Sequence, residues 1–312
     1  MTQITVLDGG MGRELARIGA PFRQPEWSAL ALMEAPHFVE RVHDAFIDAG
    51  ADVVTTNSYA SVPFHIGGAR FLAEGEALAS RAGQLARQAV QRTSRTVRVA
   101  GALPPTGGSY RPDLYDAEQA LSILSTLVAG LDSHVDLWLA ETQSLTHEIK
   151  VARQVLGESG KPLWVSYTLR DEPNDAPEPA LRSGESVAQA VEAALSAGAS
   201  AMLFNCSQPE VMAAAVETAQ RTLALRGVAL PIGVYANAFP SQREDAEANA
   251  ELHQLRADLD PHSYASWARR WLDLGAAIVG GCCGIGPEHI ADLRALVDAR
   301  HGASDVHRTP SP

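Results

Sequence analysis

The three cysteines of this chain each follow an apolar run. Cys206 comes after the run 200–205, and Cys282 and Cys283 come after the run 276–281. Such runs predict buried strands, so we expect the thiols where strands leave a sheet. Three thiolates brought together there would give a soft metal ion three ligands and leave its fourth tetrahedral position open. An open position on a zinc ion is a place where a substrate can bind.

Simpler interpretations of the thiols remain open at this point. A free cysteine often serves as a small, buried, apolar side chain. A disulfide is disfavoured, because adjacent cysteines pair only with severe strain and three is an odd number. The spacing also lacks the C-x-x-C pair of zinc fingers and ribbons. The thiols alone do not establish a metal site, so their surroundings have to decide.

Polar side chains end most of the other predicted strands. They are Asp8, Asn57, Ser58, Tyr59, Glu141 and Asn237. Three of these residues have a structural alternative: Asp8 could cap a turn, Asn57 could form an Asx turn, and Glu141 could pair with an arginine. Their coincidence with the thiols favours one shared site at the carboxyl ends of the strands.

The elements that position these residues form a regular series. Eight apolar runs predict strands at 4–8, 51–57, 97–103, 135–141, 162–168, 200–206, 231–237 and 276–282. Stretches with helical spacing lie between them, among them 68–92, 116–131, 186–197, 209–226 and 287–300. A strand and a helix repeated eight times predict an α/β protein with a single (β/α)8 TIM barrel. In that fold, catalysis takes place at the carboxyl ends of the strands.

A doubly wound open sheet is the alternative fold. It is disfavoured because the glycines of Asp8-Gly9-Gly10-Met11-Gly12 do not match the dinucleotide-binding pattern G-x-G-x-x-G. Gly50, Gly198 and Gly275 are predicted to end helices in the left-handed conformation. We expect the barrel domain to cover residues 1–300 and the polar tail 301–312 to be disordered.

Composition and charge limit the classes of partner. Of the 312 residues, 46% are hydrophobic and 20% charged, which is enough for a large core. The net charge of −12 argues against nucleic acid as a partner. No run approaches the roughly 20 apolar residues that span a bilayer, and no targeting segment is recognisable at the N-terminus. Few cysteines and no disulfide pattern indicate a reducing compartment, so we expect a soluble cytoplasmic protein.

From end to end, the chain resembles the homocysteine S-methyltransferase family. The resemblance is carried by Asp8-Gly9-Gly10-Met11-Gly12-Arg13-Glu14-Leu15, Thr56-Asn57-Ser58-Tyr59, Glu141-Thr142, Asn205-Cys206, and Gly280-Gly281-Cys282-Cys283-Gly284 followed by Pro287-Glu288-His289-Ile290. It implies a (β/α)8 barrel that binds Zn²⁺ through Cys206, Cys282 and Cys283. In size the chain looks like the short bacterial and plant branch, whose methyl donor is S-methylmethionine and often S-adenosylmethionine.

The chemistry of that family explains the residue types. Homocysteine must attack as a thiolate, yet a free thiol with a pKa of about 8.5 is mostly protonated at neutral pH. Zinc deprotonates a coordinated thiol, so the resemblance implies that the homocysteine sulfur takes the fourth position. It would then attack the methyl carbon of a sulfonium donor and give methionine.

Roles for the polar residues follow from chemistry and resemblance together. Asp8 and Glu141 would accept hydrogen bonds from the α-ammonium group of homocysteine. Asn57 and Ser58, with nearby backbone N–H groups, would receive its carboxylate. Asn237 would support the metal site or fill the open position when substrate is absent.

Three aromatic residues are candidates for a ring against the sulfonium methyl group, namely Tyr59, Tyr235 and Trp27. A cation over an aromatic ring is stabilised by roughly 0.5–2 kcal/mol, although packing in the core is an equal alternative for each residue. A cage of several such rings would instead suit betaine as the donor.

The chain departs from the family pattern at several positions. Arg13 replaces the usual small hydroxyl residue, and Ala236 stands where proline is frequent. Ile285-Gly286 replaces a Thr-Thr pair, which removes a hydroxyl N-cap from the last helix. We expect the segment 170–184 to be a mobile loop beside the site and the segment 241–261 to be an extended solvated loop, and the sequence leaves open whether either acts as a lid.

Two alternatives to a sulfonium-dependent enzyme remain. One is a betaine-type homocysteine methyltransferase. The other is a non-catalytic protein in which the three thiols store zinc or sense redox state. A storage site would be closed by a fourth protein ligand and would not need two spaced acids such as Asp8 and Glu141.

Overall fold

The computed structural model describes residues 3–171, 178–241 and 254–306, with side chains described as far as residue 302. Eight parallel strands of this part of the chain form one sheet in the order β1-β8-β7-β6-β5-β4-β3-β2. They are β1 (Thr5–Val6), β2 (Val53–Thr55), β3 (Arg98–Leu103), β4 (Leu137–Gln143), β5 (Leu163–Tyr167), β6 (Ala201–Asn205), β7 (Ile232–Tyr235) and β8 (Ile278–Val279). The predicted TIM barrel is therefore confirmed, and every predicted strand overlaps an observed one.

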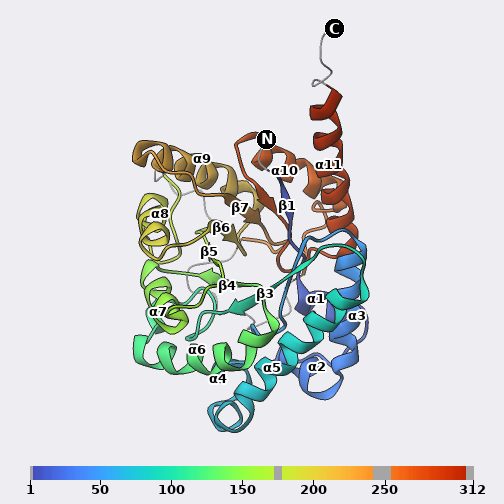
Figure 1. Ribbon diagram of the computed structural model, residues 1–312, viewed down its shortest axis with the longest axis vertical. Helices are drawn as coiled ribbons and strands as arrows, with labels where there is room; N and C mark the ends of the chain where they lie inside the picture. The colour runs from blue at the N-terminus through green and yellow to red at the C-terminus, as the bar shows by residue number, and fades with distance from the viewer. Residues whose placement is uncertain (1–2, 172–177, 242–253, 307–312) are drawn as a thin grey trace.

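The first and second strands complete the ring. Leu7 forms a parallel bridge with Val53, and the backbone N–H of Asp8 donates to the carbonyl of Val53 at 3.0 Å. The chain path in Figure 1 shows the strands at the centre and the helices around them. All eight carboxyl ends of the strands consequently point to the same end of the barrel.

Helices surround the barrel, and several have the predicted bounds. They are α1 (Met11–Arg17), α2 (Ser28–Glu34), α3 (Pro36–Asp48), α4 (Pro63–Ile66), α5 (Gly68–Arg92), α6 (Ala117–Leu131), α7 (Thr146–Leu156), α8 (Val187–Ser196), α9 (Pro209–Arg226), α10 (Pro261–Asp273) and α11 (Pro287–Val306), with 3-10 turns at Pro112–Leu114 and Asp132–His134. Gly50, Gly198 and Gly275 end their helices at φ of 107°, 66° and 97°, which confirms the predicted left-handed positions.

The end of the chain differs from the expected disordered tail. Helix α11 runs to Val306, so the beginning of the segment 301–312 is helical and projects beyond the barrel (Figure 1). The polar composition of this segment did not end the helix, because it contains no proline before Pro310. Residues 307–312 lie outside the described residues. No helix in the described part of the chain is long and apolar enough to cross a membrane.

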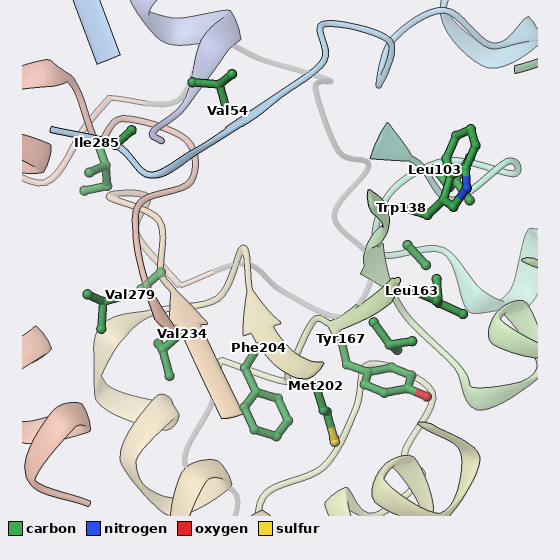
Figure 2. Close-up of a cluster of buried hydrophobic side chains, with 14 of the residues drawn as sticks. Val54, Leu103, Trp138, Leu163, Tyr167, Met202, Phe204, Val234, Val279 and Ile285 are labelled. Atoms are coloured by element: carbon green, nitrogen blue, oxygen red, sulfur yellow. The ribbon is translucent and has the colours of Figure 1, made fainter. Parts of the chain in front are cut away.

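Alternate residues along each strand pack on opposite faces of the sheet. Leu137 and Leu139 face the inside of the barrel, whereas Trp138 between them joins the layer against the helices. Leu203 and Phe204 divide in the same way. Figure 2 shows this outer layer, in which Val54, Trp138 and Phe204 come from three different strands. The period of two follows from the pleat of a strand, and it leaves both faces apolar.

Candidate functional site

A pocket opens where the strands of the barrel end. It is lined from β1 and its following loop (7–12), from β2 and its loop (55–57 and 59), from α2 and the residue before it (27–28), and from 109–110, 141–142, 206, 235, 239 and 281–283. Of the residues predicted for the site, it gathers Asp8, Asn57, Tyr59, Glu141 and the three cysteines. The carboxyl ends of the strands are thus where the sequence-based argument expected the chemistry.

The three thiols meet at this pocket. Their Sγ atoms all lie within 4.8 Å of one another, and those of Cys206 and Cys282 are 2.8 Å apart. None of the three forms a disulfide. A tetrahedral ion with metal–sulfur bonds of about 2.3 Å needs sulfur atoms roughly 3.8 Å apart, so a small adjustment of the side chains makes room for one. The cluster can hold a soft metal ion with one side facing the pocket.

The backbone around the thiols requires glycine at two positions. A Cβ atom on Gly10 would lie 2.5 Å from the carbonyl oxygen of Cys282, and one on Gly281 would lie 2.1 Å from a methyl carbon of Ile285. Both distances are far below any permitted contact. The loop after β1 can therefore approach the loop after β8 only without a side chain at Gly10, and the loop after β8 can fold back on itself only without one at Gly281.

Four non-glycine residues of the described chain have positive φ, and all of them line the pocket. They are Trp27 (51°), Tyr110 (66°), Thr142 (59°) and Cys206 (53°). Each such conformation costs of the order of 1 kcal/mol or more and persists only where the surroundings enforce it. Their concentration around one pocket is independent support for a functional site here.

Asn205 holds part of this strained backbone in place. Its Oδ1 accepts hydrogen bonds from the Thr142 backbone N–H at 3.1 Å and from the Ser166 hydroxyl at 2.7 Å. Its Nδ2 donates to Thr142 Oγ1 at 2.8 Å and lies 3.9 Å from Cys282 Sγ. In the sequence analysis Asn205 appears only as part of a family motif, and no structural role was predicted for it. Its position directly before Cys206 was the one sequence feature that pointed to the site.

Two carboxyl groups face the same pocket as the thiols. Asp8 accepts hydrogen bonds from the Thr55 backbone N–H at 2.7 Å and from the Thr55 hydroxyl at 3.1 Å. Burial nevertheless raises the pKa of Asp8 to about 7. Burial also raises the pKa of Glu141 to about 8, with further contributions from the charges of Asp8 and Cys206. Two neighbouring acids that resist ionisation are suited to receiving a cationic group such as an ammonium ion.

The raised pKa of Glu141 makes stability depend on pH. Its pKa rises from 4.5 to about 8 on folding, so its stabilising contribution is complete below about pH 4.5 and is lost as the pH rises through 8. We expect the free energy of unfolding, without substrate, to fall between pH 5 and 9 by at most about 1.4 kcal/mol per pH unit from this group. Urea denaturation across this range should show a flatter dependence for Glu141→Gln, and an identical slope in both proteins would contradict the assignment.

The remaining predicted residues divide between the pocket and its supports. Asn57 lines the pocket while its Nδ2 donates to the Ser28 carbonyl at 3.1 Å, and the Tyr59 hydroxyl lies 2.5 Å from Ser109 Oγ. Ser58 is fully buried outside the lining, where its hydroxyl donates to the Ala102 carbonyl at 3.2 Å. Asn237 is also fully buried, and its Oδ1 accepts from the Phe239 backbone N–H at 3.2 Å. The structure does not bring these last two side chains to the pocket.

The aromatic lining is larger than the sequence suggested. Trp27, Tyr59 and Tyr235 line the pocket as expected, and Tyr110 and Phe239 join them. Tyr110 lies in the loop after β3, and Phe239 follows β7 by several residues, so neither directly ends a predicted strand. Only the path of these loops brings them to the site.

A histidine in the first turn of the last helix contacts the backbone just before that helix. The Gly286 backbone N–H donates to Nδ1 of His289 at 3.2 Å. Nε2 of His289 lies 3.0 Å from the Leu259 carbonyl, which fixes the ring with its proton on Nε2. The departure Ile285-Gly286 removes a hydroxyl N-cap, but the backbone N–H of Gly286 still has a side-chain partner in His289.

The segment 170–184 is anchored at both of its described ends. Arg182 donates to Asp171 at 2.8 Å, with 4% and 0% of their side chains exposed, and its guanidinium carbon lies 4.5 Å from the ring centre of Tyr110. Residues 172–177 lie outside the described residues, as do residues 242–253 of the segment 241–261, so the mobile loop and the solvated loop stay predictions. The buried pair ties the described part of the first segment to the pocket wall.

Disruption of the buried ion pair between Asp171 and Arg182 should lower the stability of the protein. We expect Asp171→Asn to lower the free energy of unfolding by about 3 kcal/mol, because it removes one charge from a buried ion pair with Arg182. Asp113→Asn, which breaks an exposed pair with Arg111, is the matched control and should cost less than about 1 kcal/mol. Chemical denaturation measures both, and equal small losses would contradict the prediction.

Comparison with known proteins bears on this site. The family model described as homocysteine S-methyltransferase matches residues 5–297. The homocysteine S-methyltransferase of Escherichia coli K12 is 30% identical over 94% of this chain and 94% of its own length. The selenocysteine methyltransferase of Astragalus bisulcatus is 25% identical over 94% of this chain and 92% of its own length. This chain belongs to the homocysteine S-methyltransferase family.

A solved structure of the family agrees with both fold and site. The metallated form of the homocysteine methyltransferase MmuM from Escherichia coli superposes with a TM-score of 0.73 at 28% identity, covering 94% of this chain and 96% of that one. At least one family member of the same fold thus carries a metal. The cysteine cluster of the present chain is a group that could hold one too.

Proposed function

We propose that this protein transfers a methyl group from a sulfonium donor, S-methylmethionine or S-adenosylmethionine, to the thiolate of homocysteine and forms methionine, with Zn²⁺ as its metal. The observation that carries the proposal is the convergence of three thiols and two acids, Asp8 and Glu141, on one pocket. Family membership and relatives named for this reaction support it. The set of three sulfur ligands suits zinc because soft thiolates favour it over hard-ligand ions such as Mg²⁺ or Ca²⁺.

The residues of the chain would divide the work by their chemistry. Cys206, Cys282 and Cys283 would hold Zn²⁺, which when bound keeps a substrate thiol deprotonated at neutral pH. Asp8 and Glu141 would accept hydrogen bonds from the ammonium group of homocysteine and so fix the position of its sulfur. The raised pKa values of both acids mean that the arriving cation would draw them into their charged forms.

The transfer itself balances without any oxidant or reductant. A lone pair of the homocysteine sulfur forms a bond to the methyl carbon as the bond from that carbon to the donor sulfur breaks. The bonding electrons stay on the donor sulfur, which becomes a neutral thioether. Because opposite charges cancel during the transfer, an apolar pocket that excludes water favours the transition state over the separated ions. The aromatic rings of Tyr59, Tyr110 and Tyr235 provide such walls.

One assay separates the candidate functions. Zinc-loaded protein is incubated with homocysteine and, separately, S-methylmethionine, S-adenosylmethionine or betaine, and methionine is quantified. Product with a sulfonium donor supports the proposal, product with betaine alone supports the betaine-type alternative, and no product with any donor contradicts methyl transfer to homocysteine. Selenocysteine is assayed as a second acceptor because the relative from Astragalus bisulcatus is named for it.

A further inference from the structure

One fully buried amide joins the strand end that carries Glu141 to the cluster of thiols. Asn205 is the last residue of β6, and none of its surface is exposed. Its side chain contacts Thr142, the residue that follows Glu141 on β4. It also contacts Ser166 on β5 and approaches Cys282 in the loop after β8. A single side chain thus reaches segments from three other strands at the carboxyl end of the barrel.

The hydrogen bonds of Asn205 fix which end of its amide faces the sulfur. A backbone N–H can only donate, so the atom that bonds to the Thr142 N–H at 3.1 Å must be the carbonyl oxygen Oδ1. The Ser166 hydroxyl donates to the same oxygen at 2.7 Å. The amide nitrogen Nδ2 therefore faces the other way, where it donates to Thr142 Oγ1 at 2.8 Å and lies 3.9 Å from Cys282 Sγ.

The two hydrogens of Nδ2 have acceptors of unequal quality. One has Thr142 Oγ1 at a normal distance, and the other has the Cys282 sulfur at 3.9 Å, which is long even for a sulfur acceptor. A thiolate accepts a stronger hydrogen bond than a neutral thiol, because the bond is then charge-assisted. The thiolate is also the form in which cysteine binds a metal. The buried N–H donor is therefore matched to a sulfur that serves as a metal ligand.

The same side chain constrains the backbone next to Glu141. Thr142 has a φ of 59°, a left-handed conformation that a β-branched residue adopts only under constraint. Asn205 holds Thr142 at two points, its backbone N–H and its Oγ1. Because Glu141 directly precedes Thr142, this constraint helps to set the direction of the Glu141 carboxyl group. The positions of the acid and of the thiol cluster are therefore linked through one amide.

We propose that Asn205 is a positioning residue for the reaction. It orients the Cys282 thiolate as a metal ligand by an N–H···S hydrogen bond, and through Thr142 it keeps Glu141 at a fixed separation from the cluster. This inference rests on the proposed function, because it takes Zn²⁺ and homocysteine as the ligands. A substrate whose ammonium group and sulfur are held by separate parts of the protein is sensitive to a change in their spacing.

Two variants test the contact with the sulfur. Asn205→Asp keeps the shape and the acceptor oxygen but replaces the donor that faces Cys282 with a second acceptor. Asn205→Ser shortens the side chain without adding a charge, so it answers the same question if the aspartate variant does not fold. We expect the Kd for Zn²⁺, measured by competition with a chelator, to rise by roughly 10–100-fold in both. In Co²⁺-loaded protein, the sulfur-to-cobalt absorption band should move to longer wavelength, because a thiolate without its donor holds its electrons less tightly.

The link to Glu141 is tested by homocysteine binding, which is measured apart from turnover. Homocysteine is titrated calorimetrically into protein saturated with Zn²⁺. We expect its Kd for Asn205→Ser to be about tenfold or more above that of the wild type, because Thr142 is no longer held. Neither binding measurement needs a methyl donor, so both test the inference whichever donor the enzyme uses.

The matched control is Ser207→Ala. Ser207 is also fully buried, and it follows Cys206 directly as Asn205 precedes it. Its hydroxyl accepts from the Leu169 backbone N–H at 2.8 Å and lies 3.1 Å from Thr168 Oγ1, so it is engaged with the loop after β5. The variant should lower stability but leave both Kd values and the cobalt spectrum as in the wild type.

The possible results separate the inference from the proposed function. Unchanged affinity for Zn²⁺ or for homocysteine in Asn205→Ser, an unmoved cobalt band, or equal losses in Ser207→Ala would overturn the inference. Binding of both ligands by the wild type would still leave the proposed function standing in each of these cases. Wild-type protein that binds neither Zn²⁺ nor homocysteine contradicts both.

Discussion

Cys206→Ser is expected to abolish zinc binding and methionine synthesis together. The substitution removes one of three sulfur ligands from a cluster whose Sγ atoms lie within 4.8 Å of one another, and a hydroxyl group is a poor ligand at neutral pH. With only two thiolates left, we expect the zinc content to fall from about one ion per chain to less than a tenth, and kcat/KM to fall by about a thousandfold or more. Metal analysis by mass spectrometry and a methionine assay measure the two effects.

The control for Cys206→Ser is a measurement of whether the variant still folds into the barrel. Far-ultraviolet circular dichroism should show that Cys206→Ser keeps its helices, because Cys206 follows β6 and supplies no core packing beyond the site cluster. Chelation of zinc from wild-type protein should reproduce the loss of activity, and added zinc should reverse it. Full activity in the serine variant would refute the ligand assignment.

Glu141→Gln should weaken homocysteine binding much more than it slows turnover. The variant keeps the size of the side chain but removes the negative charge that would pair with the substrate ammonium group. A hydrogen bond to a charged group contributes about 1.5–3 kcal/mol, which corresponds to an increase in KM for homocysteine of roughly 10–150-fold. Steady-state kinetics with homocysteine varied at saturating donor measures the effect.

Glu148→Gln is the matched control for this experiment. Glu148 is also a buried acid, with a pKa raised to about 7 by burial, but its carboxylate accepts the backbone N–H groups of Ser144 and Leu145 instead of facing the pocket. It should lower stability and leave the KM for homocysteine unchanged. If the two variants raise that KM equally, Glu141 does not contact the substrate.

Much of the fold could be predicted because its determinants are local. An apolar run bounded by turn residues has to be buried, and eight of them alternating with helical patterns leave few architectures other than the barrel. The helices 68–92 and 209–226 were predicted with their observed bounds. The convergence of Cys206 with Cys282 and Cys283 also followed, because the carboxyl ends of parallel barrel strands meet at one end.

The predicted and observed pocket linings differ where the position of a side chain depends on nonlocal contacts. Ser58 and Asn237 were expected in the site because they end strands, yet a side chain at a strand end can turn toward the neighbouring strand, as Ser58 does toward Ala102. Tyr110 and Phe239 reach the pocket from loops, and a loop path is set by contacts with other elements. Sequence periodicity carries no information about such contacts.

The distribution of the three cysteines along the chain has a consequence for the whole barrel. Cys206 and Cys282 are 76 positions apart, and strand β7 with helices α9 and α10 lies between them. An ion held by both would close a loop of 76 residues, about a quarter of the chain, much as a disulfide closes a long loop. The neighbouring contact between β1 and β8 is short, since the two strands are paired over only two residues each. Under the proposed function, protein without its Zn²⁺ would be less stable as well as inactive. Local unfolding would then expose it to proteases more often.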